Sequence, residues 1–146
     1  PVREDLCVTG EIKHVNDSDF DFRQFSHLKE KITIRDQHAT HRRGYDQNFI
    51  LNNMEDNLGL AAILREASKG RQLIIKTTQP CLQLYTGTYL DGQYSRSGSP
   101  FHAYHGLCLE CQSYPDAINQ SHFPSIILNP GEAYYHKTSL RFSVYT

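Results

Sequence analysis

The chain carries no excess of either charge. Fifteen Lys and Arg stand against sixteen Asp and Glu, which leaves a formal net charge of -1. Nucleic acids and anionic lipids are attracted by large positive fields, so we expect neither as a partner. No apolar run approaches the roughly 18 residues of a membrane helix, and no signal segment opens the chain. A protein without membrane association, located in the cytoplasm, is therefore predicted.

Cysteine is scarce, and several catalytic motifs are missing. The four cysteines are Cys7, Cys81, Cys108 and Cys111. They are too few for a disulfide-dense secreted scaffold, so reduced thiols are expected. The sequence holds neither a glycine-rich phosphate loop nor a G-x-S-x-G turn, which excludes the usual nucleotide-binding and serine-hydrolase chemistry.

Alternation of apolar and polar residues is the main structural signal. It predicts strands at residues 31–35, 81–85, 106–111 and 140–144, separated by turns at 68–70, 91–92, 97–100 and 129–131. Residues 58–67 fit a helix by propensity and a strand by period, and the β-like residues 73–75 favour a hairpin. We expect an all-β, antiparallel β-sandwich forming a single domain over residues 1–146.

Glu110 is the first candidate for chemistry. In a strand over residues 107–112, Leu107, Leu109 and Cys111 face a core, while Glu110 points to the opposite face. Apolar neighbours would remove water from the carboxylate and raise its pKa, a setting typical of functional carboxylates. The alternative is an ordinary exposed glutamate on a strand.

Two further segments present polar groups suited to a ligand. Gln83 and Tyr85 alternate with Leu82 and Leu84, and an amide beside an aromatic ring suits a sugar, although such pairs also occur on ordinary sheet surfaces. Asp46 lies where a loop enters a strand, a common position for ligand-binding groups; a turn aspartate bonded to nearby backbone is the alternative.

A zinc site is the competing hypothesis for one short segment. His102, His105, Cys108 and Cys111 recur at every third position. Tetrahedral zinc sites usually combine two pairs separated by a longer excursion, whereas these four lie on one partly extended segment. In a strand Cys108 and Cys111 also face opposite ways, so we predict no metal site.

Several motifs in consistent order resemble the galactose mutarotase (aldose 1-epimerase) family from end to end. The most telling are Gly-Tyr-Asp-Gln-Asn-Phe at 44–49, Gln-Leu-Tyr-Thr-Gly at 83–87 and Cys-Leu-Glu at 108–110. The others are at residues 9–12, 20–23, 77–80, 90–92, 115–120, 123–124, 130–132 and 141–143.

The resemblance implies an antiparallel β-supersandwich that interconverts the α and β anomers of galactose or glucose without a cofactor. By motif, Glu110 matches the general base, and Asp46 and Gln83 match ligands of the sugar hydroxyls. The family's acid histidine, a second histidine and a sugar-binding arginine belong to a portion that would precede Pro1. The chain is thus interpreted as the C-terminal part of the family fold, incomplete at its N-terminal side. An isomerase acting on a hexose is expected.

The missing acid leaves a second hypothesis open, and the chain also departs from the family pattern at four positions. Gln47, Cys81, His105 and Cys111 replace the residues that the family usually has there. A catalytically inactive carbohydrate-binding paralogue or fragment would keep Asp46, Gln83 and Glu110 without an acid. A sandwich cut within a sheet also exposes strand edges, so self-association is expected.

Overall fold

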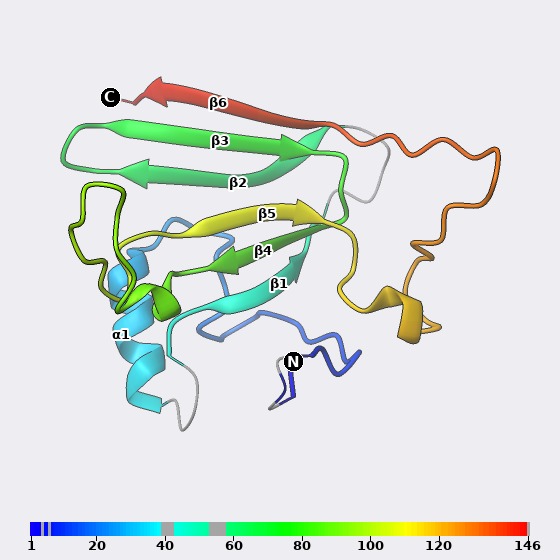
Figure 1. Cartoon of the computed structure of the whole chain (residues 1–146), viewed down its shortest axis with the longest axis horizontal. Coiled ribbons are helices and arrows are strands. Elements are labelled where there is room, and N and C mark those ends of the chain that lie inside the picture. The colour runs from blue at the N-terminus through cyan, green and yellow to red at the C-terminus, as the bar shows by residue number, and fades with distance from the viewer. Residues whose placement is uncertain (4, 6, 39–42, 53–57, 146) are drawn as a thin grey trace. The chain divides into compact units, whose positions relative to one another are not determined.

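The computed structural model describes residues 1–3, 5, 7–38, 43–52 and 58–145. Its strands form two three-stranded sheets, of order β1-β4-β5 and β2-β3-β6 (Figure 1). The predicted antiparallel β architecture is confirmed, with one helix added to it. The elements are α1 (Leu28–His38), β1 (Asp46–Ile50), β2 (Gly59–Glu66), β3 (Arg71–Thr77), β4 (Cys81–Tyr85), β5 (Cys108–Gln112) and β6 (Thr138–Val144), with short 3-10 helices η1 (Thr88–Leu90) and η2 (Ala117–Asn119).

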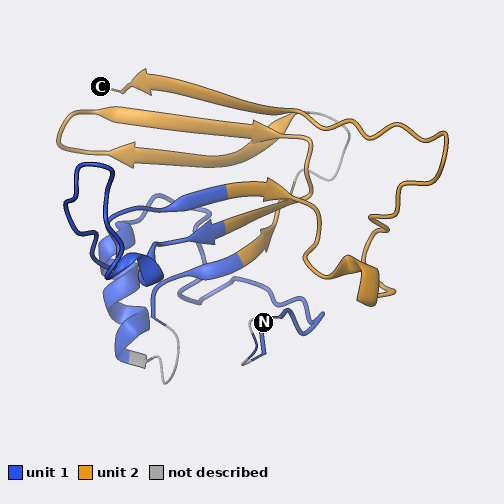
Figure 2. Ribbon diagram, in the orientation of Figure 1, with its two compact units in different colours: residues 1–47, 84–109 blue, residues 48–83, 110–146 orange. Residues whose placement is uncertain are grey.

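The chain divides into two compact units (Figure 2). Unit 1 comprises residues 1–47 and 84–109, and unit 2 comprises residues 48–83 and 110–146. Sheet β2-β3-β6 belongs to unit 2, and β1, β4 and β5 each contribute residues to both units. The single domain expected over residues 1–146 stays a prediction.

The hairpin predicted for residues 58–75 is present as β2 and β3. The two strands pair antiparallel from Gly59 opposite Thr77 to Glu66 opposite Arg71, with a bulge between Leu60 and Ala62. The Glu66 carboxylate closes the turn by accepting hydrogen bonds from the backbone of Ser68 and Lys69. The hydrogen bond from the Ser68 side chain lowers the pKa of Glu66, and the smaller effect of burial opposes it.

The strand predicted at residues 31–35 is wrong, because this stretch lies inside α1. Ile32 and Ile34 satisfy a period of two, but the observed burial follows a helical period, with Ile32 half-buried and Ile34 exposed. The polar residues Arg35 and Asp36 make the tertiary contacts instead. The Arg35 guanidinium lies 5.2 Å from the centre of the Tyr45 ring, a cation-π contact that an alternation pattern cannot reveal.

Tyr45 is the centre of packing in unit 1. Its side chain is fully buried, and the rings of Phe20 and Phe22 meet it edge-on at centroid distances of 6.0 and 5.1 Å. The Tyr45 hydroxyl donates a 2.7 Å hydrogen bond to the carbonyl of Asp19. A buried phenol needs such a partner, so the N-terminal segment is tied to the first strand.

Strand β6 pairs antiparallel with β3 at the end of its sheet. Ser139 and Ser143 are half-buried, and the apolar side chains are exposed. We call the exposed set Leu140, Phe142 and Val144 the β6 apolar strip; these side chains are 57, 75 and 74% exposed. The strand predicted at residues 140–144 is confirmed as part of β6.

The isolated chain is expected to self-associate, because the β6 apolar strip and the outer edge of a terminal strand favour contact with a second copy. Replacing Phe142 by Asp removes apolar surface and adds charge, so the weight-average mass in sedimentation equilibrium should fall toward that of the monomer. Tyr94→Asp is the matched control, since Tyr94 is 71% exposed outside the sheets. A monodisperse wild-type monomer at tens of micromolar would contradict this expectation.

Candidate functional site

A pair of residues fixes the entry to β1. The backbone N–H of Tyr45 donates to the Thr86 hydroxyl at 2.8 Å, and the N–H of Thr86 donates to the Tyr45 carbonyl at 2.9 Å. Both side chains are buried. Buried backbone groups must be paired, so these bonds align the start of β1 with the residue after β4. Asp46, the residue after Tyr45, is thereby held at the beginning of its strand.

Asp36 holds the backbone of Gly44, two residues before Asp46. Its carboxylate accepts hydrogen bonds from the N–H of Gly44 at 2.6 Å and from the hydroxyl of Tyr104 at 2.5 Å. Burial, with the nearby Asp36 carboxylate, raises the pKa of Tyr104 to about 12. Gly44 has a φ of 61°, and a Cβ there would lie 2.5 Å from the Thr86 hydroxyl oxygen. Only glycine fits this conformation and this space.

Asp46 is the first residue of β1, as predicted, and its side chain is half-buried. Tyr45, directly paired with Thr86, points to the same side as the buried Leu84 and Leu82, because residues two apart on a strand share a face. Asp46 points to the opposite face of β1, the one that it shares with Asn48.

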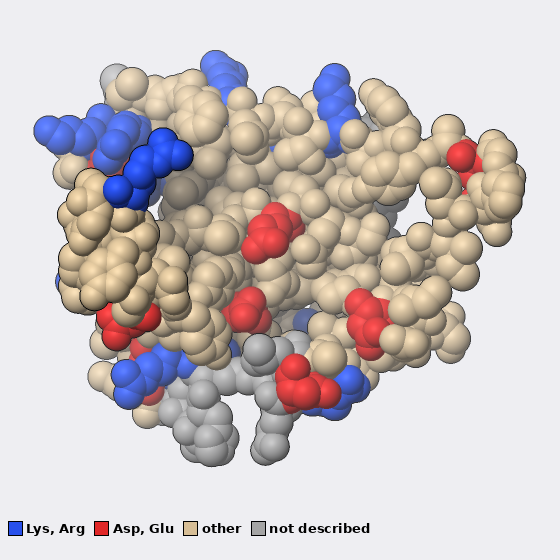
Figure 3. Space-filling view, in the orientation of Figure 1, with Lys and Arg blue, Asp and Glu red and all other residues tan. Residues whose placement is uncertain are grey.

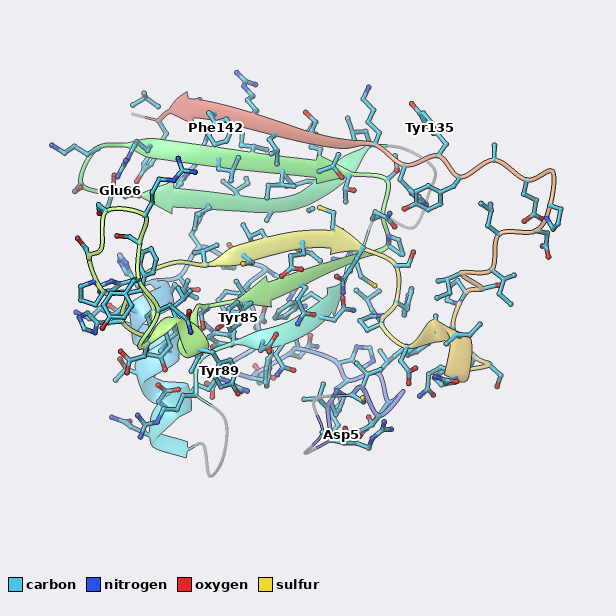
Figure 4. The ribbon with its side chains drawn as sticks, viewed as in Figure 1. Asp5, Glu66, Tyr85, Tyr89, Tyr135 and Phe142 are labelled. Atoms are coloured by element: carbon cyan, nitrogen blue, oxygen red, sulfur yellow. The ribbon has the colours of Figure 1, made fainter. Side chains whose placement is uncertain are left out.

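Strand β4 has the predicted bounds and the predicted alternation around Gln83. Leu82 and Leu84 are buried, whereas Gln83 and Tyr85 are half-buried on the other face. The Tyr85 hydroxyl accepts a 2.7 Å hydrogen bond from the backbone N–H of Tyr89. The two rings are stacked at a centroid distance of 6.3 Å and are labelled in Figure 4. Tyr85 is therefore held in place from within unit 1.

Glu110 lies in the middle of β5, and its side chain is exposed. Leu109 and Cys111, its neighbours along the strand, are half-buried on the other face, as the alternation predicts. The expected loss of hydration at the carboxylate is wrong for this chain. The alternation of apolar and polar residues correctly predicted the face to which the Glu110 side chain points. It could not predict whether other residues cover that face.

Gln83 and Glu110 share one face of their sheet within unit 2. The Gln112 amide donates a 3.2 Å hydrogen bond to the Asn48 side chain, which reaches across β4 from β5 to β1. Asn48 also hydrogen-bonds the Cys81 thiol. Asn48 therefore lies on the face of the sheet that Cys81 and Gln83 share, because these two residues are two positions apart on β4. Gln112 and Glu110 are also two positions apart, so they share one face of β5. An amide and a carboxylate on neighbouring strands therefore project to one side.

A small apolar cluster bounds this face at the start of β4. Cys81 is fully buried, in a cluster with Tyr114 and Ala117 against which Ile50 and Phe123 pack. Burial raises the pKa of the Cys81 thiol. The departure from the family pattern at position 81 is thus accommodated by close packing, and the polar part of the face begins at Gln83.

The histidine and cysteine segment is not arranged around a common centre. His102 donates a 3.2 Å hydrogen bond from Nδ1 to the Asp91 carboxylate, and its ring meets that of His105 edge-on at a centroid distance of 5.1 Å. Cys108 and Cys111 alternate between exposed and half-buried positions on β5. Among the described residues, no three or more His, Cys, Asp or Glu side chains converge as metal ligands would. Within the same residues, no helix has the length and apolarity needed to cross a membrane.

Charge on the molecular surface follows the balanced composition. Figure 3 shows Lys and Arg side chains and Asp and Glu side chains scattered in small groups on the visible face, some of them adjacent. Most of that face carries neither sign. A neutral, polyhydroxylated ligand meets no strong field there, so its binding would depend on individual hydrogen bonds.

Comparison with known proteins decides the family. A sequence model of the family described as aldose 1-epimerase matches residues 1–141. The chain belongs to the aldose 1-epimerase family. Among curated relatives, the galactose mutarotase of Bos taurus is 42% identical over 99% of this chain, and that of Homo sapiens is 39% identical over the same share. The aldose 1-epimerase of Escherichia coli is 33% identical over 97% of the chain.

The match covers part of each relative. The chain spans 41% of the length of these three proteins and corresponds to their C-terminal portion. A crystal structure of a GalM/aldose epimerase homologue from C. elegans superposes with a TM-score of 0.85 and 28% identity. The superposition covers 100% of this chain and 43% of the homologue's chain. The predicted fold, the C-terminal part of the family's β architecture, is confirmed.

Several supporting residues of this family member were not identified from the sequence. Asn48 and Gln112 lie within the predicted strands, but the sequence did not reveal that their side chains form a hydrogen bond from β1 to β5 across β4. Asp36 and Tyr104 are 68 positions apart in the sequence, and no local pattern signals that a carboxylate and a phenol meet. The Gly-Tyr-Asp motif at 44–46 was the one available signal, because its glycine marks a special backbone conformation.

Gly44→Ala is expected to destabilise the fold by about 3 kcal/mol, combining left-handed backbone strain of about 1–2 kcal/mol with the clash against Thr86. Gly92→Ala is the matched control, because Gly92 has a φ of 82° and open space around a Cβ. It should lose only about 1–2 kcal/mol. Urea unfolding followed by circular dichroism measures both; equal losses would show that the contact with Thr86 does not matter.

Alkaline pH is expected to weaken the fold through Tyr45. Burial raises its pKa from 10.0 to about 12, so the folded chain keeps a proton that the unfolded chain releases. This stabilisation is complete below about pH 10 and is lost as the pH rises through 12, with a limiting slope of about 1.4 kcal/mol per pH unit. Tyr45→Phe should be less stable than wild type at pH 8 but lose less of its free energy of unfolding between pH 9 and 11. Parallel losses in the two proteins would refute this assignment; Tyr104 titrates in both and cancels.

Proposed function

We propose that this chain forms part of an aldose 1-epimerase acting on a hexose such as galactose or glucose, with Glu110 as its general base. Membership of the family supports the reaction type. The observation that carries the assignment of Glu110 is its place on β5, where an accessible carboxylate shares a face with the Gln83 amide on the neighbouring strand. A base must reach a substrate hydroxyl, and exposure in this chain leaves its oxygens free to do so.

The reaction proceeds by opening and closing of the sugar ring. Glu110 removes the proton from the anomeric hydroxyl, and the oxygen left behind forms the aldehyde carbonyl as the bond from the anomeric carbon to the ring oxygen breaks. An acid delivers a proton to that ring oxygen. Rotation about the bond to the carbonyl carbon, followed by the reverse steps on the other face, gives the other anomer. No electrons are gained or lost, and the base and the acid are both regenerated.

Gln83 and Asp46 are proposed as ligands of the sugar hydroxyls. The Gln83 amide both donates and accepts hydrogen bonds, as a hydroxyl does, and its half-buried position on β4 limits the orientations open to it. Asp46 accepts from two hydroxyls in the same way, and the Tyr45–Thr86 pairing holds its backbone in place. Fixed ligands lower the entropic cost of orienting the substrate toward the base.

The acid is proposed to come from the portion of the family architecture that this chain does not span. The family resemblance assigns it to a histidine there, and a histidine near its ordinary pKa serves both as donor and as acceptor. Activity would then require that portion together with this chain. The cytoplasm stays the predicted compartment.

The proposal is tested in a chimaera in which this chain replaces the matching C-terminal 41% of the Bos taurus galactose mutarotase. Polarimetry follows the rotation of freshly dissolved α-D-galactose. Glu110→Gln should lower kcat by about 10²- to 10⁴-fold, the usual contribution of a general base, with KM nearly unchanged. Glu30→Gln, an exposed glutamate on α1, is the matched control and should keep full turnover.

Two outcomes would contradict the assignment. Unchanged turnover in Glu110→Gln removes this residue from the role of base. A chimaera that binds galactose but does not accelerate mutarotation, although its fold is intact by circular dichroism, favours a carbohydrate-binding protein without catalysis.

A further inference from the structure

Tyr104 holds a backbone conformation that tyrosine seldom adopts. Three non-glycine residues of the described chain have a positive φ, namely Asp17 at 53°, Tyr104 at 69° and Asp116 at 55°. Aspartate tolerates the left-handed region because its short side chain bonds nearby backbone, whereas a bulky aromatic residue gains no such compensation. Strain of this kind persists only where surrounding contacts enforce it, and it is often stored where geometry matters for function.

Two contacts of Tyr104 enforce that conformation. Its backbone N–H donates a 3.1 Å hydrogen bond to the carbonyl of Gly87, two residues after the end of β4. Its hydroxyl donates to the Asp36 carboxylate at 2.5 Å, and Asp36 lies in the last turn of α1. The backbone and the side chain of one residue therefore connect the end of β4 with the helix.

The Tyr104 side chain also reaches the segment that enters β1. Asp36 accepts from the N–H of Gly44 with its other carboxylate oxygen, at 2.6 Å, so one side chain joins Tyr104 to Gly44. The ring packs on the same glycine, because a Cβ at Gly44 would lie 2.8 Å from a ring carbon of Tyr104. Arg35 donates to the Gly44 carbonyl at 2.5 Å, so side chains of α1 hold both polar groups of this residue.

These contacts form a closed set of hydrogen bonds around the start of β1. Tyr45 pairs with Thr86 through both of its backbone groups. The residue after Thr86 accepts from the Tyr104 backbone, and the residue before Tyr45 is joined to the Tyr104 hydroxyl through Asp36. Asp46 follows directly on this set, all of which lies within unit 1. Tyr104 therefore constrains the backbone next to Asp46 from two directions, from the end of β4 and from α1.

We propose that Tyr104 is a positioning residue for substrate binding: through Asp36 it fixes the backbone that precedes Asp46, and so the direction of the Asp46 carboxylate toward a sugar hydroxyl. The inference rests on the proposed role of Asp46 as a ligand. A ligand already held in one orientation binds without the entropic cost of ordering it, so loosening it lowers affinity. The base on β5 is not part of this set of bonds. The expected signature of Tyr104 is therefore an effect on KM and not on kcat.

The test is a double-mutant cycle in the chimaera with Bos taurus galactose mutarotase, followed by polarimetry. Tyr104→Phe keeps the ring but loses the hydroxyl, so KM for α-D-galactose should rise about 3- to 10-fold, the usual worth of one hydrogen bond, with kcat nearly unchanged. In an Asp46→Ala background the same substitution should change KM no further, because the group that it positions is gone. Tyr94→Phe, also between η1 and β5 and 71% exposed, is the matched control and should leave KM unchanged.

Other outcomes would overturn the inference. An unchanged KM in Tyr104→Phe, a loss confined to kcat, or a KM effect of full size in the Asp46→Ala background shows that Tyr104 does not act through Asp46. Asp36→Asn removes one acceptor oxygen and should reproduce the rise in KM, so it decides the question if Tyr104→Phe is unfolded by circular dichroism. Where the chimaera shows no turnover, the Kd of galactose by calorimetry replaces KM in the same comparison, and absence of binding overturns the inference.

Failure of the proposed function gives a different result. Turnover that survives Glu110→Gln removes the base, but it leaves the coupling between Tyr104 and Asp46 as expected. A KM unaffected by Asp46→Ala removes the ligand role of Asp46 and this inference with it. A rise in KM in both single variants that adds in full in the double variant removes this inference alone.

Discussion

The hydroxyl of Thr86 determines where the first strand begins. It accepts from the N–H of Tyr45 while the Thr86 backbone donates to the carbonyl of the same residue, so both backbone groups of a fully buried tyrosine are paired at one point. Tyr45 in turn organises the aromatic packing of unit 1 and holds the segment around Asp19. Without this pairing, the chain would bury two unsatisfied backbone groups at the start of the strand that carries Asp46.

A second constraint acts from the other end of the same strands. The hydrogen bond between Gln112 and Asn48 spans β4, and Asn48 also hydrogen-bonds the thiol of Cys81. Polar side chains that meet above a central strand fix which faces of the three strands coincide, because a slip of one residue would turn each of them to the other side. The placement of Gln83 and Glu110 on a shared face thus follows from residues that have no chemical role in the proposed reaction.

Prediction from sequence succeeded where burial alone determines the pattern. Leu82 and Leu84 are buried between polar neighbours, and the bounds of β4 could be read from them; the same holds for the β2–β3 hairpin, where two strands need each other as partners. It failed at residues 31–35, where Ile32 and Ile34 fit a period of two although the stretch is helical, and the deciding contacts come from Arg35 and Asp36. Exposure of Glu110 and of Phe142 was also beyond it, because neighbours along a strand do not say what covers that strand.

The cysteines differ in a way that makes the proposed catalytic face open to direct observation. Cys108 is exposed on β5, on the same side as Glu110 and two positions before it, whereas the thiol of Cys81 is enclosed beside Tyr114 with a raised pKa. A maleimide dye would therefore distinguish these two thiols by accessibility. Attached at Cys108, it would report through its emission on the arrival of any molecule at the Glu110 side of the sheet.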